Sequence, residues 1–199
     1  PVVLQQKERL GGIAREVVQD FSADPTRVYA AGLSAGGAAA AILAATYPDL
    51  FAAVGVHSGL PSGAAKDMPT AFAAMNGGGT VQPRGTRRTV PTIVFHGDAD
   101  RTVNPVNGDR VIAQATPGRT LDAVITRGTS EGGMTYTCTV QREGSEPALL
   151  EQWILHGAGH AWSGGSASGT YTDPRGPDAS REMLRFFLAH TTAAAQTRH

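Results

Sequence analysis

Three short segments carry residue types that together perform nucleophilic chemistry. Ser34 is the central residue of a G-x-S-x-G sequence, Asp100 lies in a polar segment that follows an apolar run, and His160 lies between glycines. A serine hydroxyl is a weak nucleophile unless a base accepts its proton, and an acid must orient that base. The chain order serine, acid, histidine is the order of enzymes with a nucleophile elbow. The three segments therefore predict acyl transfer through a serine.

The surroundings of Ser34 support an elbow. A short apolar run over residues 28–33 predicts a buried strand, and an Ala-rich helix is predicted to begin at about Gly36. Gly32 and Gly36 are expected to let neighbouring backbone pass without a Cβ clash. The N–H of Ala35, at the helix N-terminus, is predicted to stabilise an oxyanion. The alternative interpretation is a glycine-rich turn without chemistry.

Two carboxylates compete for the role of the acid. Asp98 lies closer to the end of the preceding strand and is expected to brace the turn by accepting backbone N–H groups. Asp100 lies further along the loop, from which a carboxylate reaches a histidine more easily. We favour Asp100 and keep Asp98 as the alternative.

The remaining reactive side chains have less specific interpretations. His57 and His96 end strands and are predicted to line the substrate cleft, and Trp162, next to the predicted base, is predicted to form a cleft wall. His156 is expected to pack or hydrogen-bond beside the last strand. Cys138, on the apolar face of an alternating segment, is expected to be a buried, inert thiol. No His, Asp or Glu cluster has metal-ligand spacing, so we predict no metal and no cofactor.

The elements that must position these residues alternate between helix and strand. Helical periodicity predicts helices over residues 5–21, 36–47 and 178–190. Apolar strands are predicted over residues 28–33, 51–56 and 92–95, and a meander over 121–126, 134–141 and 149–155. This alternation indicates an α/β fold, a mostly parallel central sheet flanked by helices. One domain over residues 1–190 and a frayed tail over 191–199 are expected.

Composition excludes several classes of partner. The 199 residues include 17 Lys+Arg and 17 Asp+Glu, so a nucleic-acid-binding arm or a polybasic membrane patch is not expected. No apolar run approaches the roughly 20 residues that cross a bilayer, and no signal peptide is visible. One cysteine forbids an internal disulfide.

Residues 31–37 and 45–59, with the segments 96–100 and 157–165, resemble the poly(3-hydroxybutyrate) depolymerase family of esterases. The resemblance runs from about residue 5 to about residue 190. It implies an α/β-hydrolase fold in which Ser34 is the nucleophile, Asp100 the acid and His160 the base. It also implies a secreted, extracellular esterase that acts on short-chain polyhydroxyalkanoates, since members are mostly such bacterial enzymes. Relatives act on feruloyl and acetyl esters, which makes a carbohydrate esterase the alternative.

The chain departs from the family pattern at its front. Members carry earlier strands and a His-Gly loop that supplies a second oxyanion donor, and residues 1–190 are expected to form the C-terminal two-thirds of the family's domain. Without those strands, one edge of the sheet is predicted to be unpaired and to associate, for example in a homodimer. A non-catalytic binding module on an incomplete hydrolase fold is therefore the second hypothesis.

Overall fold

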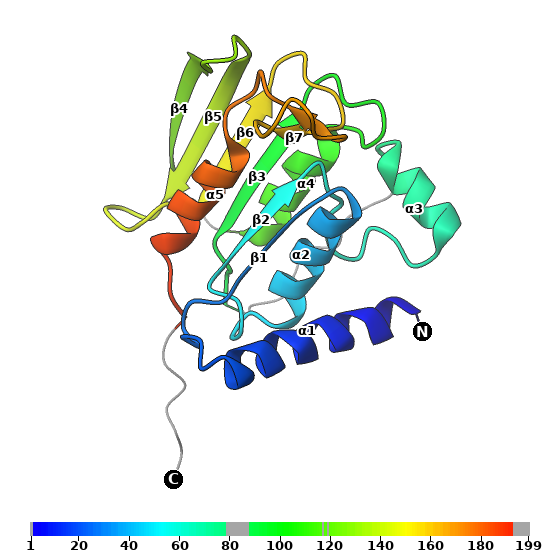
Figure 1. Cartoon of the computed structure of the whole chain (residues 1–199), viewed down its shortest axis with the longest axis vertical. Coiled ribbons are helices and arrows are strands. Elements are labelled where there is room, and N and C mark those ends of the chain that lie inside the picture. Colours follow the sequence, from blue (N-terminus) through cyan, green and yellow to red (C-terminus); the bar gives the residue numbers. More distant parts are fainter. Residues whose placement is uncertain (1, 79–87, 117, 119, 193–199) are drawn as a thin grey trace.

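A six-stranded sheet with the strand order β1-β2-β3-β6-β5-β4 organises the protein (Figure 1). The computed structural model describes residues 2–78, 88–116, 118 and 120–192. Four neighbouring strands are parallel, namely β1 (Tyr29–Leu33), β2 (Ala53–His57), β3 (Thr92–Gly97) and β6 (Leu150–Leu155). They continue into the antiparallel strands β5 (Thr135–Arg142) and β4 (Asp122–Thr129). The predicted α/β architecture with a mostly parallel sheet is confirmed.

Helices cover both faces of this sheet. On one face, α2 (Ala35–Thr46) and α4 (Val106–Ala115) pack on Val54, Val56 and Val94. On the other face, α5 (Ala179–Leu188) buries Phe186 and its neighbours against β2 and β3. Each such fully buried apolar side chain stabilises the fold by about 1.5–3 kcal/mol. A small sheet of β7 (Trp162–Ser163) and β8 (Thr172–Asp173) follows β6 in the chain, and α3 (Met68–Met75) lies in the long connection between β2 and β3.

Two sequence predictions about the first helix and the first strand need correction. Helix α1 (Val2–Asp20) forms as expected and packs against α2. Its predicted apolar face is largely exposed to solvent. Four side chains of that face are 40–78% exposed, namely Leu10, Ile13, Val17 and Phe21. Strand β1, predicted to be buried on both faces, is only half-buried and exposes Ala31.

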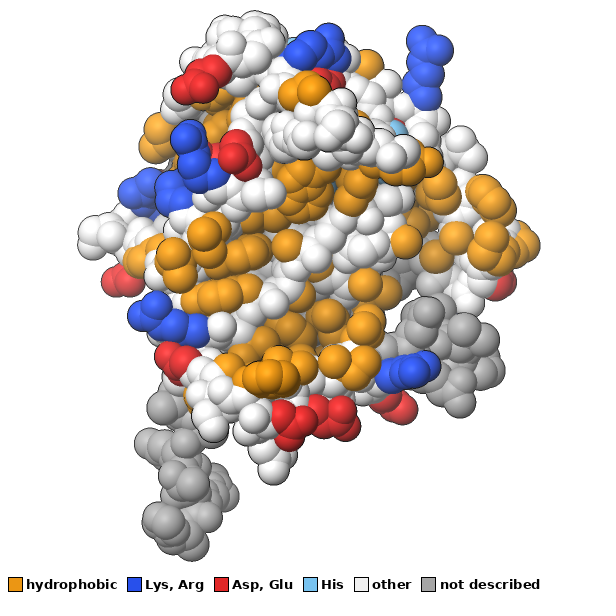
Figure 2. Space-filling view, viewed as in Figure 1, with side chains coloured by type: hydrophobic (Ala, Val, Ile, Leu, Met, Phe, Trp, Pro, Cys, Tyr) orange, Lys and Arg blue, Asp and Glu red, His pale blue; other side chains and the backbone are white. Residues whose placement is uncertain are grey.

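The exposure of β1 follows from its position in the sheet. It is the first strand in the sheet order, so within the described part of the chain no strand lies on its outer side. Strands β2 and β3, one and two places further in, are completely buried as predicted. Hydrophobic side chains gather across the face that carries α5 and this open edge (Figure 2).

Cys138 lies on β5 and its side chain is buried against Trp153 and Met134. Burial among apolar groups raises the pKa of its thiol to about 12. The expected burial of this thiol is therefore confirmed. No helix in the described residues is long and apolar enough to cross a bilayer. The predicted tail lies outside the described residues from position 193 onward.

Candidate active site

Ser34 stands at the apex of the turn between β1 and α2. Its backbone has φ 56° and ψ −115°, a conformation that L-residues with a Cβ rarely adopt and that costs about 1–3 kcal/mol. Two hydrogen bonds hold it there: Ser34 N–H donates to the carbonyl of His57 at 2.9 Å, and Ala38 N–H donates to the carbonyl of Ser34 at 2.9 Å. The side chain makes no capping bond to α2.

Close backbone packing around this turn depends on two glycines. A Cβ on Gly32 would lie 2.4 Å from the carbonyl carbon of Gly36, and a Cβ on Gly37 would lie 2.9 Å from the oxygen of Gly32. Neither distance is tolerable. A Cβ on Gly36 would meet nothing within 4 Å. The predicted clearance role is therefore right for Gly32 and wrong for Gly36, and the second close approach belongs to Gly37.

His160 and Asp100 form a buried pair at the same edge of the sheet. His160 Nδ1 and Asp100 Oδ2 are 2.8 Å apart, and the two side chains are 14% and 0% exposed. Asp100 follows β3 and His160 follows β6, while Ser34 follows β1. Because these strands are parallel, all three residues lie beyond the carboxyl ends of the strands, where open α/β sheets bind ligands.

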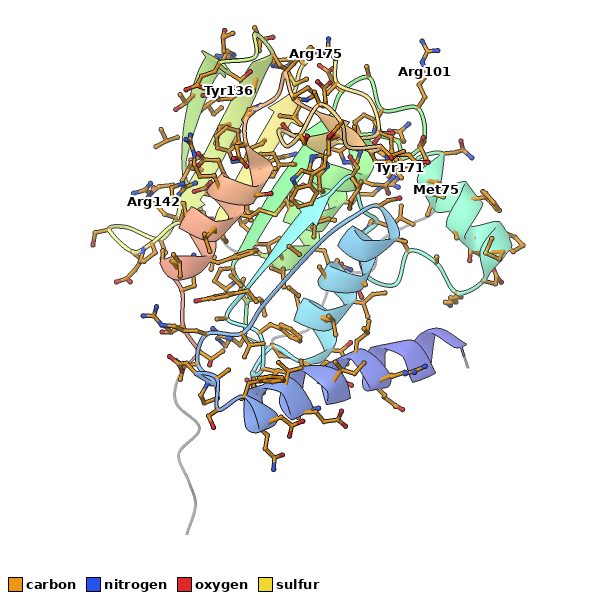
Figure 3. All side chains as sticks on the ribbon, viewed as in Figure 1. Met75, Arg101, Tyr136, Arg142, Tyr171 and Arg175 are labelled. Carbon is orange, nitrogen blue, oxygen red and sulfur yellow. The ribbon has the colours of Figure 1, made fainter. Side chains whose placement is uncertain are left out.

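The carboxylate of Asp100 is held by its own loop. Its Oδ1 accepts the backbone N–H groups of Thr102 at 2.8 Å and Val103 at 2.9 Å. Burial alone would raise the pKa of Asp100, but these bonds and those from His96 and His160 hold it well below its ordinary value. Arg101, the next residue, extends away from the body of the molecule and does not neutralise this charge (Figure 3).

Asp98 pairs with a different histidine. Its Oδ2 accepts from Nδ1 of His156 at 2.8 Å, and its Oδ1 accepts the N–H of Gly157 at 2.7 Å. Nε2 of His156 lies 2.9 Å from the hydroxyl of Thr137 on β5. Asp98 and His156 are 43% and 39% exposed. The bonds from His156 and Gly157 lower the pKa of Asp98 despite the opposing effect of burial. The expectation that His156 hydrogen-bonds beside the last strand is confirmed.

His57 does not line a cleft. Its side chain is 0% exposed and is stacked between Phe95 and Trp162, with ring centroids 5.8 and 5.1 Å away. The prediction of a cleft residue is therefore wrong for His57, because the β7 segment covers its ring. Trp162 itself is half-buried, and its indole N–H donates to the hydroxyl of Ser180 at 3.1 Å.

The sequence predicted that His96 lines the cleft, but the structure buries it beside Asp100. His96 is 3% exposed, its Nε2 lies 2.9 Å from the carbonyl of Val103, and Asp100 Oδ2 lies 3.5 Å from the same nitrogen. The only available signal was the spacing of four residues between His96 and Asp100. Among the residues that the structure describes, no group of three or more His, Cys, Asp or Glu side chains is arranged to hold a metal ion.

Comparison with known proteins identifies the family. The family model described as "Esterase PHB depolymerase" matches residues 9–133, more than half of the chain. The chain belongs to this family. The range matched to the esterase PHB depolymerase family includes Ser34 and Asp100, while His160 lies beyond it.

Individual relatives are similar in sequence and in structure. Poly(3-hydroxyalkanoate) depolymerase C of Paucimonas lemoignei is 32% identical over 167 residues, covering 78% of this chain and 38% of that protein. The structure of an acetyl xylan esterase from Aspergillus awamori has a TM-score of 0.62 at 17% identity, covering 92% of this chain and 67% of that one. The PHB depolymerase from Penicillium funiculosum has a TM-score of 0.58 at 18% identity, covering 83% of this chain and 52% of that one.

These likenesses confirm the α/β-hydrolase fold and the predicted family. The chain spans less than two-fifths of the length of the Paucimonas relative and about half of the Penicillium enzyme. The activities of these longer proteins are therefore only proposed for this chain.

Proposed function

We propose that the chain carries the catalytic residues of a serine esterase acting on short-chain polyesters of the poly(3-hydroxybutyrate) type. The observation that carries the proposal is a strained serine, Ser34, at the same sheet edge as a buried Asp100–His160 pair. A turn with a purely structural role does not need a serine at φ 56° flanked by the close approaches of Gly32 and Gly37. Catalysis by a serine further requires a histidine that an acid orients, and Asp100 and His160 are placed to meet that requirement.

The roles follow from the atoms. Nδ1 of His160 donates to the ionised Asp100, which leaves the lone pair of Nε2 to accept the proton of Ser34. The serine oxygen then attacks the ester carbonyl, and the N–H of Ala35 at the start of α2 stabilises the oxyanion. His160 gives the proton to the leaving alcohol. Water, deprotonated by the same imidazole, then releases the acid and restores Ser34.

Support for a polyester substrate comes from the family and from the Paucimonas relative. The likeness to an acetyl xylan esterase structure favours a carbohydrate ester as the alternative. An insoluble polymer cannot enter a cell, so the proposal includes an extracellular location. Secretion of the full-length protein into the medium of its source organism would support this location, and retention within the cells would contradict it.

The test is hydrolysis of a soluble butyrate ester by the 199-residue chain and by its Ser34→Ala variant. Removing a triad member leaves only the residual rate of binding and oxyanion stabilisation, so we expect a loss of about 10³-fold or more in kcat. Labelling by a fluorophosphonate gives a second readout, because it requires an activated serine. Films of poly(3-hydroxybutyrate) and acetylated xylan then distinguish the two substrate classes.

Ser22→Ala is the matched control. Ser22 is an exposed serine at the end of α1 that also has a positive φ, of 50°, and it lies far from the strand ends that carry the site. We expect this variant to keep the parent activity and labelling. A folded parent chain that neither turns over ester nor reacts with the fluorophosphonate would instead favour the binding-module hypothesis.

The open edge of β1 extends the proposal to a partner. The outer edge of β1, which no strand of the described residues pairs, has Ala31 exposed at its centre and is a template for another strand, and a second copy of this chain supplies one in a homodimer. Light scattering should give twice the 20.6 kDa chain mass, and Ala31→Lys should restore the monomer because a charge blocks edge pairing. A monomeric parent chain would refute this part.

A further inference from the structure

We propose that His57 is a positioning residue that joins the nucleophile turn to the loop carrying the catalytic histidine, by accepting a hydrogen bond at Nε2 from the backbone of Ser163. The role rests on the proposed function. It differs from the cleft role expected from the sequence, since no atom of His57 needs to touch substrate.

Two hydrogen bonds from one residue make this connection. The carbonyl of His57 accepts the N–H of Ser34 at 2.9 Å, and its Nε2 accepts the N–H of Ser163 at 3.0 Å. Ser163 lies three residues after His160, and its hydroxyl donates to the carbonyl of Pro177 at 2.7 Å. The elbow and the histidine loop are therefore fastened to the same residue at the end of β2.

The ring of His57 is held in one orientation and one tautomer. A backbone N–H can only donate, so Nε2 must present its lone pair and the proton must reside on Nδ1. Nδ1 lies 3.2 Å from the hydroxyl of Ser58, which accepts that proton's hydrogen bond. Stacking on Phe95 and Trp162 fixes the ring plane.

The surroundings keep this imidazole neutral. Complete burial is the main reason that the pKa of His57 falls to about 3. The neighbouring His96 on β3 and His160 oppose a further positive charge, and Asp100 offsets them only in part. The acceptor at Nε2 is thus present throughout the range in which the esterase would operate. His57 therefore stays neutral when the neighbouring His160 takes the serine proton.

The test compares His57→Gln with His57→Leu. Both lose the stacked ring, but the glutamine carbonyl can still accept the N–H of Ser163. We expect the leucine variant to lose about 10- to 100-fold in kcat, because a small displacement of catalytic groups costs that much, with little change in KM. The glutamine variant should recover most of that loss. His190→Gln, at a buried histidine near the opposite end of the sheet, should leave kcat unchanged.

Nitrogen-15 NMR of the parent chain tests the assignment without any activity. We expect the Nδ1–H tautomer for His57 and no titration between pH 8 and about 5. An Nε2–H tautomer, or titration near the ordinary histidine pKa, would overturn the proposal even if the leucine variant failed to fold. A folded leucine variant with parent kcat, or a glutamine variant as slow as leucine, would also overturn it. If the parent chain proves inactive, the proposed function fails, and the NMR result still decides the role of His57.

Discussion

Two aspartate–histidine pairs bridge the same two loops of this protein, and they differ mainly in their exposure to water. The inner pair, Asp100–His160, and the outer pair, Asp98–His156, have the same separation of 2.8 Å between Nδ1 and Oδ2. The inner side chains are 0% and 14% exposed, and the outer ones are 43% and 39% exposed. Distance alone therefore does not distinguish the proposed catalytic pair from a surface contact.

The difference shows what burial adds to such a pair. In a dry site, charges interact several times more strongly than at the surface, where water and salt screen them. In the proposed reaction His160 accepts the serine proton at its other nitrogen, whereas Nε2 of His156 already lies 2.9 Å from the hydroxyl of Thr137. The outer pair consequently fastens β5 and β6 to the acid loop. Both ring nitrogens of His156 already have partners, so neither is available to act as a base.

The largest expected effect separates the two acids. Asp100→Asn should lower kcat for a butyrate ester by about 10³- to 10⁴-fold, because the amide holds His160 in the wrong tautomer. Asp98→Asn should lower it by less than about 5-fold, since an exposed pair contributes at most about 1 kcal/mol. Steady-state kinetics of the two folded variants check this. Equal losses would mean that the acid role is not confined to Asp100.

The next effect is the change in the free energy of unfolding at acid pH, which tests whether the burial of His57 lowers its pKa. Because the pKa of His57 is lowered to about 3, the unfolded chain binds a proton between pH 6.5 and 3 that the folded chain does not. Stability should therefore fall as the pH falls through this window, by up to about 5 kcal/mol at its acid end. Urea denaturation at several pH values measures it.

His57→Gln is the control for this pH dependence, because it removes the buried titratable group. Its stability should decrease less steeply with acid than that of the parent chain. The lowered pKa of Asp98 makes a contribution that is present above pH 3.8 and is lost only as the pH falls through the lowered value. The carboxylate of Asp98 should therefore contribute no change in stability between pH 7 and 5. If the free energy of unfolding fell equally steeply with pH in both proteins, buried His57 would not be the main source of the pH dependence.

The smallest effect measures the outer pair directly. A double-mutant cycle with Asp98→Asn and His156→Gln should give a coupling of about 0.2–1 kcal/mol in the free energy of unfolding. Raising the ionic strength from about 0.1 to 1 M should reduce it, because the screening length falls to about 3 Å. A coupling well above this range that ignores salt would show that the outer pair behaves as a buried one.

Much of the fold could be predicted because its strands are distinctive in sequence. The apolar runs near residues 51–56 and 92–95 became β2 and β3, and the alternation around Cys138 became β5. Helix α4 was missed, since ten residues with a glycine give only a weak periodic signal. The half-exposed state of β1 also could not be predicted from its own residues, because it depends on which strand lies beside it.

The candidate site divides in a similar way. The placement of Ser34, Asp100 and His160 at one edge of the sheet could be predicted because each follows a strand in a recognisable order along the chain. His57 was placed wrongly, because the residues that bury it come from a segment more than 100 positions away, whose path no local pattern reveals. The pairing of Asp98 with His156 and of Asp100 with His160 likewise depends on how two loops face each other.

The lone thiol of Cys138 has a practical consequence for studying these loops. It is buried and its pKa is raised to about 12, so at neutral pH it scarcely reacts with maleimides or other alkylating reagents. A cysteine introduced on an exposed position of either loop would be the single reactive thiol in the protein. Fluorescent or spin labels attached there would report on loop motion without removal of the native cysteine.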